Sequence, residues 1–289
     1  MTDTFHDPHT VYVGRDNGGA EHTVTPELIE RYSVGTGDRH AWYHSPSPFG
    51  GPIAPAFLFH SEAYRDLGWY LPNLIGTLHA RQEWELFYPM RVGERVLTRS
   101  TIVDFYRKRN RDYVVNEVLI TNASGRWLQR SRTHQSFLAD GDASKNTMVE
   151  KKTGESAQQV SEGDARPLTP IEKTITHEMC EAFSGPQRTY HTDLEMAQAM
   201  GFPDVVVQGM MSVCFLSELM TVNFGVGWFC GGRLDVKLTS ILWPNDRLQL
   251  CGMVRDEVRE GEKTRVNCDI WCEKSDGKKT VVGTASALK

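Results

Sequence analysis

The order of hydrophobic and polar positions runs through the same series of elements twice. Each series begins at a threonine suited to cap a helix, Thr25 or Thr176, followed by a short helix with a glutamate in its first turn. A polar loop carrying histidine comes next, and then a hydrophobic segment, residues 52–71 in the first series and 205–224 in the second. The second segment is apolar on nearly all faces, which predicts a helix buried all round.

Strands are predicted for the rest of each series, where β-branched, aromatic and polar residues alternate. The predicted ranges are 78–88, 95–107, 112–122 and 126–137 in the first series, and 233–242, 246–258, 264–274 and 279–288 in the second. The segments 122–125 and 275–277 have the composition of hairpin turns.

The two series are copies of one another. Residues 23–33 align with 174–184 at an offset of 151, and residues 93–96 align with 245–248 at an offset of 152. Asp104 then falls on Asp256 and Gly125 on Gly277, again at 152. This steady offset indicates a tandem duplication. We expect an N-terminal module over 10–138, a polar linker over 139–167 and a C-terminal module over 168–289.

A buried helix followed by an antiparallel meander predicts an α+β fold in which each half is a sheet wrapped around its central helix. We expect the two sheets to join into one long antiparallel sheet, with both helices on its concave face, because each module then pairs the edge strand of the other. A homodimer of the whole chain is compatible with this arrangement, although no residue argues for it.

Composition and charge exclude several classes of function. The 289 residues carry 32 Lys and Arg against 37 Asp and Glu, which argues against a general nucleic-acid binder. The most apolar stretch, 209–232, contains Glu218 and Asn223, so no membrane span is expected. The N-terminus shows no secretion signal, and the six cysteines form no CxxC pair, which favours reduced thiols in a cytoplasm and no zinc site.

Two groups of residues resemble the hydratase motif of MaoC-like dehydratases. One group is Gly37-Asp38 and His44 followed by 50–55; the other is His191-Thr192-Asp193, then 201–203 and Gly209. The family contains R-specific enoyl-CoA hydratases of the hot-dog fold, and two-repeat chains of this length are double hot dogs. The resemblance implies reversible hydration of a 2-enoyl-CoA to a 3-hydroxyacyl-CoA in fatty acid metabolism, with an acyl-CoA as the bound partner and with no cofactor or metal.

Both halves depart from the family signature, which places Asp after Gly and His five residues later. In the first half Asp38 is present, but the fifth residue on is Tyr43 and the histidine is His44. In the second half His191 is in place, but Pro186 stands where the Asp belongs. The resemblance makes Asp38, His44 and His191 the candidate catalytic residues, with Asp193 expected only to cap the following turn.

Hydration needs a base, an acid and donors for the enolate oxygen. The family uses a glycine that opens the central helix as the oxyanion donor; Gly209 matches it, and Ala56 is its counterpart in the first half. We expect Tyr43, Ala56 and Gly209 to contact the substrate, and the chemistry to occur in the first half with Asp38 and His44 as the acid–base pair. The opposing hypothesis uses His191 with an acid from elsewhere. Asp38 also fits an ordinary turn, and His191 fits a residue that only shapes the pocket.

Arg109 and Arg111, in a basic hairpin, are candidates for binding the 3′-phosphorylated ADP of coenzyme A, since guanidinium groups donate bidentately to phosphate. A solvated basic hairpin is the competing interpretation. Two other functions stay open: an acyl-CoA thioesterase, in which Asp38 would activate water, and a non-catalytic acyl-thioester binder, which the altered motifs allow.

Overall fold

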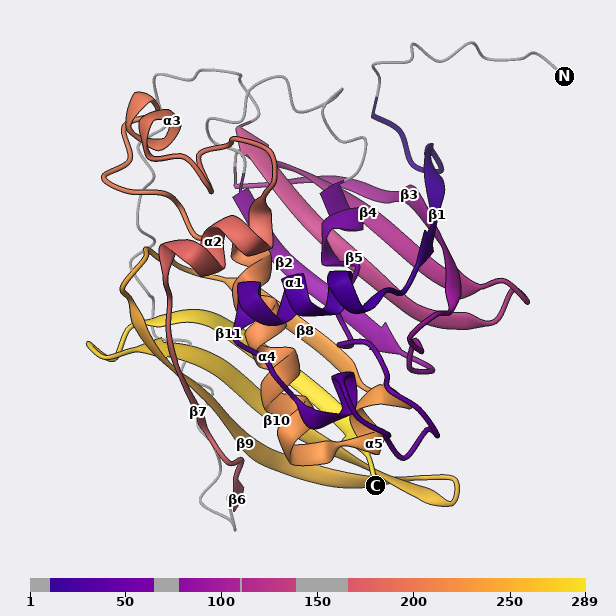
Figure 1. Ribbon diagram of the computed structural model, residues 1–289. Coiled ribbons are helices and arrows are strands. Elements are labelled where there is room, and N and C mark those ends of the chain that lie inside the picture. Colours follow the sequence, from indigo (N-terminus) through magenta and orange to yellow (C-terminus); the bar gives the residue numbers. More distant parts are fainter. Residues whose placement is uncertain (1–10, 65–77, 110, 139–165) are drawn as a thin grey trace, which may run out of the picture.

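Two series of helices and strands follow each other along the chain in the computed structural model, which describes residues 11–64, 78–109, 111–138 and 166–289 (Figure 1). The first contains β1 (Asp16–Thr23), α1 (Pro26–Thr36), η1 (Ala41–Tyr43), η2 (His60–Tyr64), β2 (Leu78–Leu86), β3 (Arg95–Lys108), β4 (Arg111–Asn122) and β5 (Trp127–Leu138). The second contains β6 (Arg166–Pro167), β7 (Ile171–Thr174), α2 (His177–Ser184), α3 (Leu194–Ala199), α4 (Gly209–Phe224), α5 (Val226–Phe229), β8 (Arg233–Leu238), β9 (Arg247–Glu260), β10 (Lys263–Lys274) and β11 (Lys279–Leu288).

One sheet contains all eleven strands of the described residues. Its strand order is β1-β3-β4-β5-β2-β8-β11-β10-β9-β6, and β7 also pairs with β9. The two halves join where β2 pairs antiparallel with β8, with Trp84 opposite Leu234. The prediction of a single joined antiparallel sheet is therefore confirmed, and the junction strands have no free edge.

The same backbone hydrogen bonds recur at the positions that the sequence repeat aligns. The Val24 amide donates to the Glu94 carbonyl at 2.9 Å, and the Ile175 amide donates to the Asp246 carbonyl at 3.0 Å. These bonds tie the residue before each first helix to the turn that enters β3 or β9. The repeat is thus a repeat of structure as well as of sequence.

Both predicted helix caps are present. The Thr25 hydroxyl accepts from the Leu28 amide at 3.3 Å, and the Thr176 hydroxyl accepts from the Met179 amide at 3.1 Å. Each bond satisfies an amide that the first turn leaves without a partner. These caps fix where α1 and α2 begin.

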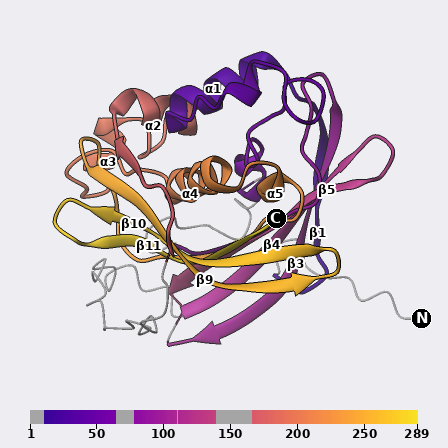
Figure 2. The same cartoon turned by 90° about the horizontal axis from the view of Figure 1, so that it is seen from below.

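The helix α4 lies between the sheet and an outer layer formed by α1 and α2 (Figure 2). Its residues from Met210 to Leu216 are all buried, as its apolar faces predict. In the first half the matching segment forms turns and then the short 3₁₀ helix η2, and its remainder lies outside the described residues. A long central helix is therefore described in the second half alone.

Three strands were not expected from the sequence: β1, β6 and β7. The segment of β1, DNGGAEHT, has two glycines and five polar residues, and Thr23 is its single β-branched residue. It pairs with β3 at the edge of the sheet, across an irregular register between Asp16 and Gly19. Of the predicted linker 139–167, only Arg166 and Pro167 belong to the described residues, and they form β6.

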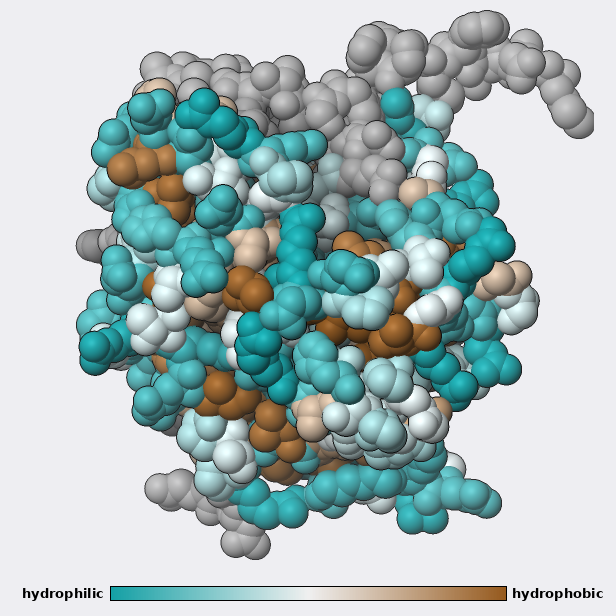
Figure 3. All heavy atoms as spheres, in the orientation of Figure 1, coloured by the Kyte–Doolittle hydropathy of each residue, from teal (hydrophilic) through white to brown (hydrophobic). Residues whose placement is uncertain are grey.

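The surface on the helix side is a mixture of polar residues and small apolar patches (Figure 3). One apolar patch covers α3, where Leu194 is 45% and Met196 is 41% exposed. Among the described helices, none is long and apolar enough to cross a membrane.

Candidate functional site

The Asp38 carboxylate is buried at the end of α1. Gly37 ends the helix in the left-handed conformation, with φ of 67°, which turns the chain inward at Asp38. One carboxylate oxygen accepts from the Tyr43 hydroxyl at 2.8 Å, and the other accepts from the His40 amide at 3.2 Å. Asp38 is only 2% exposed, so its charge depends on these donors.

The predicted partner His44 does not reach Asp38. Residues Ala41–Tyr43 form the 3₁₀ helix η1, in which successive side chains point about 120° apart. Tyr43 therefore faces the interior, and His44, one residue later, is exposed. Within the described residues the His44 side chain makes no hydrogen bond or ion pair. The expected Asp38–His44 pair is corrected to an Asp38–Tyr43 pair.

Two charged side chains of the second half lie close to Asp38. Lys173 of β7 and Glu218 of α4 form an ion pair at 2.6 Å, with side chains 9% and 12% exposed. Burial raises the pKa of Asp38, while the Tyr43 hydrogen bond and the positive charge of Lys173 act against that rise. Burial, and then the nearby Asp38, raise the pKa of Glu218 to about 7. Two carboxyl groups thus share one lysine at the junction of the halves.

The second half places His191 where the first half places Tyr43. The Ile53 amide donates to the Trp42 carbonyl at 2.9 Å, and the Val206 amide donates to the Tyr190 carbonyl at 3.0 Å. Because these bonds are equivalent, the residues that follow, Tyr43 and His191, are equivalent too. Each half has therefore kept one member of the motif, the acid in the first and the histidine in the second.

The His191 imidazole is held as a neutral base. Its Nδ1 lies 2.6 Å from the carbonyl oxygen of Val206. A carbonyl oxygen can only accept, so Nδ1 carries the proton and Nε2 keeps its lone pair. Burial lowers the pKa of His191, although the bond to Val206 acts in the opposite direction. The ring can therefore take up a proton at Nε2.

Gly209 begins α4 three residues after Val206. Gln208 makes no side-chain hydrogen bond to the first turn, so the amides at the start of this 16-residue helix have no side-chain cap. A methyl group added at Gly209 would lie 2.4 Å from Leu238 Cδ2, so a larger residue here would displace the Leu238 side chain. Uncapped amides at a helix N-terminus favour a developing negative charge.

Ala56, the counterpart of Gly209, does not begin a helix. Residues 56–59 form turns, and the 3₁₀ helix η2 begins only at His60. Ala56 is buried, but its amide has no aligned helix dipole behind it. Of the two predicted oxyanion donors, the structure therefore provides the helix N-terminus for Gly209 alone.

Two residues of the first half, Tyr64 and His79, lie near Gly209. Tyr64 ends η2 and His79 lies in β2, with the Tyr64 hydroxyl 2.9 Å from His79 Nδ1. A methyl group at Gly209 would lie 3.6 Å from the same nitrogen. No motif marks these residues, because they meet α4 only through the pairing of β2 with β8.

The arginines of the basic hairpin between β3 and β4 differ in their contacts. Arg109 is exposed and adopts a positive φ of 51° at the turn. Arg111 donates to the Ser136 hydroxyl and carbonyl, both at 3.1 Å, and Arg107 pairs with Asp112 at 2.7 Å. Asn110 lies outside the described residues. Of the predicted cluster, Arg107 and Arg111 therefore bond to residues of neighbouring strands, and Arg109 is exposed at the turn.

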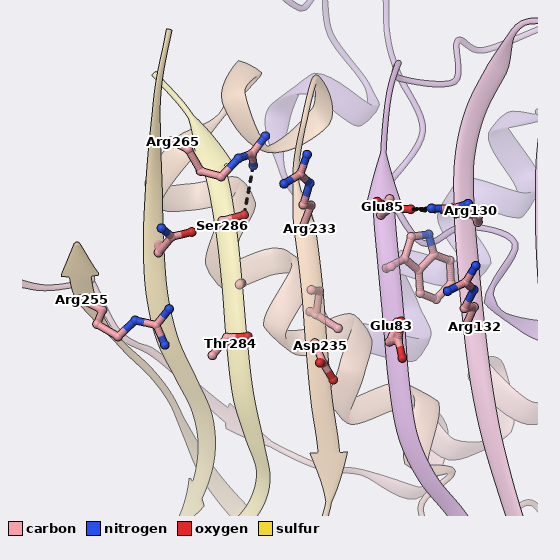
Figure 4. A pocket seen from close by; sticks show the side chains of 14 residues that line it. Glu83, Glu85, Arg130, Arg132, Arg233, Asp235, Arg255, Arg265, Thr284 and Ser286 are labelled. Atoms are coloured by element: carbon pink, nitrogen blue, oxygen red, sulfur yellow. Dashed lines mark hydrogen bonds and ion pairs between the residues drawn. The ribbon is translucent and has the colours of Figure 1, made fainter. Parts of the chain in front are cut away.

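A hollow of about 320 Å³ lies on the outer face of the sheet where the halves meet (Figure 4). Arginines and carboxylates of neighbouring strands line it, and Arg130 pairs with Glu85 there. Arg265 donates to the Ser286 hydroxyl at 3.0 Å on the same face. These paired charges lie on the opposite side of the sheet from α4, so the hollow is separate from the residues around Gly209.

The described residues contain no cluster of three or more His, Cys, Asp or Glu side chains that could hold a metal ion.

Asp193 caps α3, accepting from the Met196 amide at 3.0 Å and from Arg188 at 2.7 Å, which confirms its predicted capping role.

Comparison with known proteins finds relatives by sequence and by structure. Residues 11–130 match the family model of the FAS1-like dehydratase domain region. No curated protein sequence matches the chain significantly.

Several solved structures share the fold across nearly the whole chain. A protein described as a MaoC-like dehydratase has a TM-score of 0.73 at 16% identity, covering 95% of this chain and 98% of the other. A MaoC-like dehydratase from Phytophthora capsici has a TM-score of 0.69 at 15% identity, covering 96% and 95%. A Mycobacterium tuberculosis protein with a double hotdog fold has a TM-score of 0.61 at 12% identity, covering 96% of each. The predicted double hot-dog fold is thus supported.

Proposed function

Because the dehydratase match of the first half and the shared double hot-dog fold relate this chain to the MaoC-like dehydratases, we propose that it is a hydro-lyase acting on acyl thioesters. Its substrate pair would be a 2-enoyl-CoA and a 3-hydroxyacyl-CoA, interconverted by adding or removing water. One observation carries this proposal: a neutral histidine with a free Nε2, His191, is bonded to the segment that leads into the uncapped N-terminus of α4.

His191 would act as the base in hydration. Its Nε2 takes one proton from water as the water oxygen bonds to C3 of the enoyl group. The electrons of the double bond move onto the thioester oxygen, and the amides at the start of α4 stabilise that charge. His191 then returns the same proton to C2, so that water has been added and the enzyme is unchanged. Because one base delivers them, the hydroxyl group at C3 and the hydrogen at C2 are added to the same face of the double bond.

In the first half, Asp38 would have a structural role and take no part in the reaction. Asp38 is buried, bonded to Tyr43 and close to Lys173, and its predicted histidine partner is exposed. A catalytic carboxylate must reach the substrate within hydrogen-bonding distance. We therefore place the chemistry in the second half, and we assign Asp38 to the junction between the halves.

The test is the purified chain with a panel of 2-enoyl-CoAs of different length. Loss of the conjugated enoyl absorbance without release of free thiol is the expected result. Release of free thiol would identify a thioesterase instead, and no change with any chain length would support a non-catalytic binder. His191→Ala should remove the activity, with exposed His177→Ala on α2 as the matched control.

A further inference from the structure

The hydroxyl of Tyr64 and the ring of His79 form a hydrogen-bonded pair beside the first turn of α4. Both residues come from the first half, whereas α4 and His191 come from the second. A methyl group on Gly209 would lie 3.6 Å from His79 Nδ1 and 3.8 Å from His79 Cβ. The pair therefore borders the place where the proposed function puts the thioester oxygen.

The hydrogen bonds around His79 determine which nitrogen carries its proton. The amide nitrogen of Gln82 donates to the Glu83 carbonyl at 3.0 Å, which fixes the orientation of that amide. Gln82 Oε1 accepts from the Thr133 hydroxyl at 2.7 Å and lies 3.1 Å from His79 Nε2. Since Oε1 can only accept, His79 Nε2 carries the proton and Nδ1 presents a lone pair.

Tyr64 must then donate to His79. Its hydroxyl is 2.9 Å from the Nδ1 lone pair, so the single hydroxyl proton is used in that bond. Burial lowers the pKa of His79 to about 4, so the ring stays neutral near pH 7 and Nδ1 remains an acceptor. The Tyr64 oxygen is left with lone pairs, and it can only accept further hydrogen bonds.

An acceptor of this kind is what the second-half motif lacks. A carboxylate in the motif accepts hydrogen bonds only, and Pro186 stands at its place in this half. Burial, and then the nearby Tyr190, raise the pKa of Tyr64, which keeps the hydroxyl protonated. The Tyr190 ring lies 4.0 Å from the His191 ring, so Tyr64 and His191 both lie close to Tyr190.

We propose that Tyr64 takes the place of that acid by holding the reacting water. The water donates one hydrogen to the Tyr64 oxygen and the other to His191 Nε2, which removes it as the water oxygen bonds to C3. Tyr64 exchanges no proton, and His79 acts as a positioning residue that keeps the tyrosine oxygen an acceptor. This inference rests on the proposed hydration, and it means that residues of both halves form the active site.

Tyr64→Phe removes the oxygen and keeps the ring. Its kcat with a 2-enoyl-CoA should fall about a hundredfold, since a reactant held out of place costs roughly that factor. KM should change little, and so should the Kd for saturated butyryl-CoA, which contains no double bond to hydrate. The matched control is Tyr106→Phe, because Tyr106 also lies against a histidine, 3.2 Å from His134 Nδ1, but belongs to β3.

His79→Leu is the second variant, and it leaves the tyrosine oxygen in place. It frees the hydroxyl proton to point at the water, so kcat should fall about tenfold with the Kd for butyryl-CoA unchanged. Gln82 still accepts from Thr133 in this variant, so no buried acceptor loses its only donor. The double variant should be no slower than Tyr64→Phe alone, because both act on one water.

Three outcomes would overturn the inference. If Tyr64→Phe and Tyr106→Phe have the same kcat while the unmodified chain hydrates enoyl-CoA, Tyr64 holds no reacting water although the proposed function stands. If Tyr64→Phe weakens butyryl-CoA binding and keeps kcat, the tyrosine contacts the acyl chain instead. If the unmodified chain hydrates no enoyl-CoA, the proposed function fails first and the inference fails with it.

Discussion

The Tyr43 hydroxyl donates a 2.8 Å hydrogen bond to Asp38, from the position that His191 occupies in the other half. A phenol in this buried place cannot serve as a base near neutral pH, because burial and then the charge of Asp38 raise its pKa well above the usual range. The first half has thus kept the spacing of the motif and lost its proton acceptor. What remains is a buried polar contact at the junction.

Tyr43→Phe should therefore destabilise the protein. The variant removes one donor to a carboxylate that is 2% exposed, and a buried acceptor left without a donor costs about 1–3 kcal/mol. The free energy of unfolding, measured with urea, should fall by that amount. Tyr88→Phe, at a tyrosine that is 48% exposed, should change it by less than about 0.5 kcal/mol. Equal stability of the two variants would show that Asp38 does not need this bond.

Glu218→Gln should change how stability depends on pH. The folded protein holds the pKa of Glu218 at about 7, above its ordinary value of 4.5, chiefly by burial. Between these values the folded state binds more protons than the unfolded state, so stability falls as pH rises through this window. The variant should remove part of this fall, and Asp38, whose pKa is also raised, should keep a remainder in the same direction.

Unfolding midpoints in urea at pH 5 and pH 8 measure this effect. The difference between the two midpoints should be smaller in Glu218→Gln than in the unmodified chain. Glu172→Gln, at an exposed glutamate of β7, is the control and should leave the difference as it is. A steeper loss of stability with rising pH in Glu218→Gln would contradict the assignment.

Much of the fold could be predicted because local patterns and packing agree. The strands β2 to β5 and β8 to β11, the two threonine caps and the buried helix α4 all follow from periodicity, capping residues and the repeat. The strands β1 and β7 could not be found, because an edge strand gains its stability from its neighbour more than from its own residues.

The site was harder to predict, because it depends on one turn and on contacts between the halves. The 3₁₀ helix η1 decides that Tyr43 points inward and His44 outward, and three residues of sequence do not reveal that choice. Tyr64 and His79 are brought to Gly209 by the pairing of β2 with β8. The motif identified Asp38, His191 and Gly209, while their division between two clusters is a property of the tertiary structure.

Turnover of single variants decides which half is active. His191→Ala should lower kcat by at least about a hundredfold, because it removes the proposed proton acceptor. His44→Ala should keep the kcat of the unmodified chain, since that side chain is exposed and Tyr43 takes the bond to Asp38. Initial rates of enoyl-CoA hydration measure both. If His44→Ala loses turnover and His191→Ala stays active, the active site lies in the first half.

Arg109→Glu tests the remaining predicted contact, that of the nucleotide of coenzyme A. Arg109 is exposed at the turn of its hairpin, whereas Arg107 and Arg111 bond to Asp112 and Ser136, so charge reversal at Arg109 changes the surface without breaking those strand contacts. If the hairpin binds the 3′-phosphorylated ADP, KM for an enoyl-CoA should rise about tenfold at low salt and less at high salt, because ions screen exposed charges. KM for the enoyl-pantetheine analogue, which lacks the nucleotide, should stay the same. Arg126→Glu makes the same charge change in the β4–β5 hairpin, where the arginine lies over the Tyr88 ring, and it should affect neither substrate. An equal rise of KM for both substrates in Arg109→Glu would exclude a contact between this hairpin and the nucleotide.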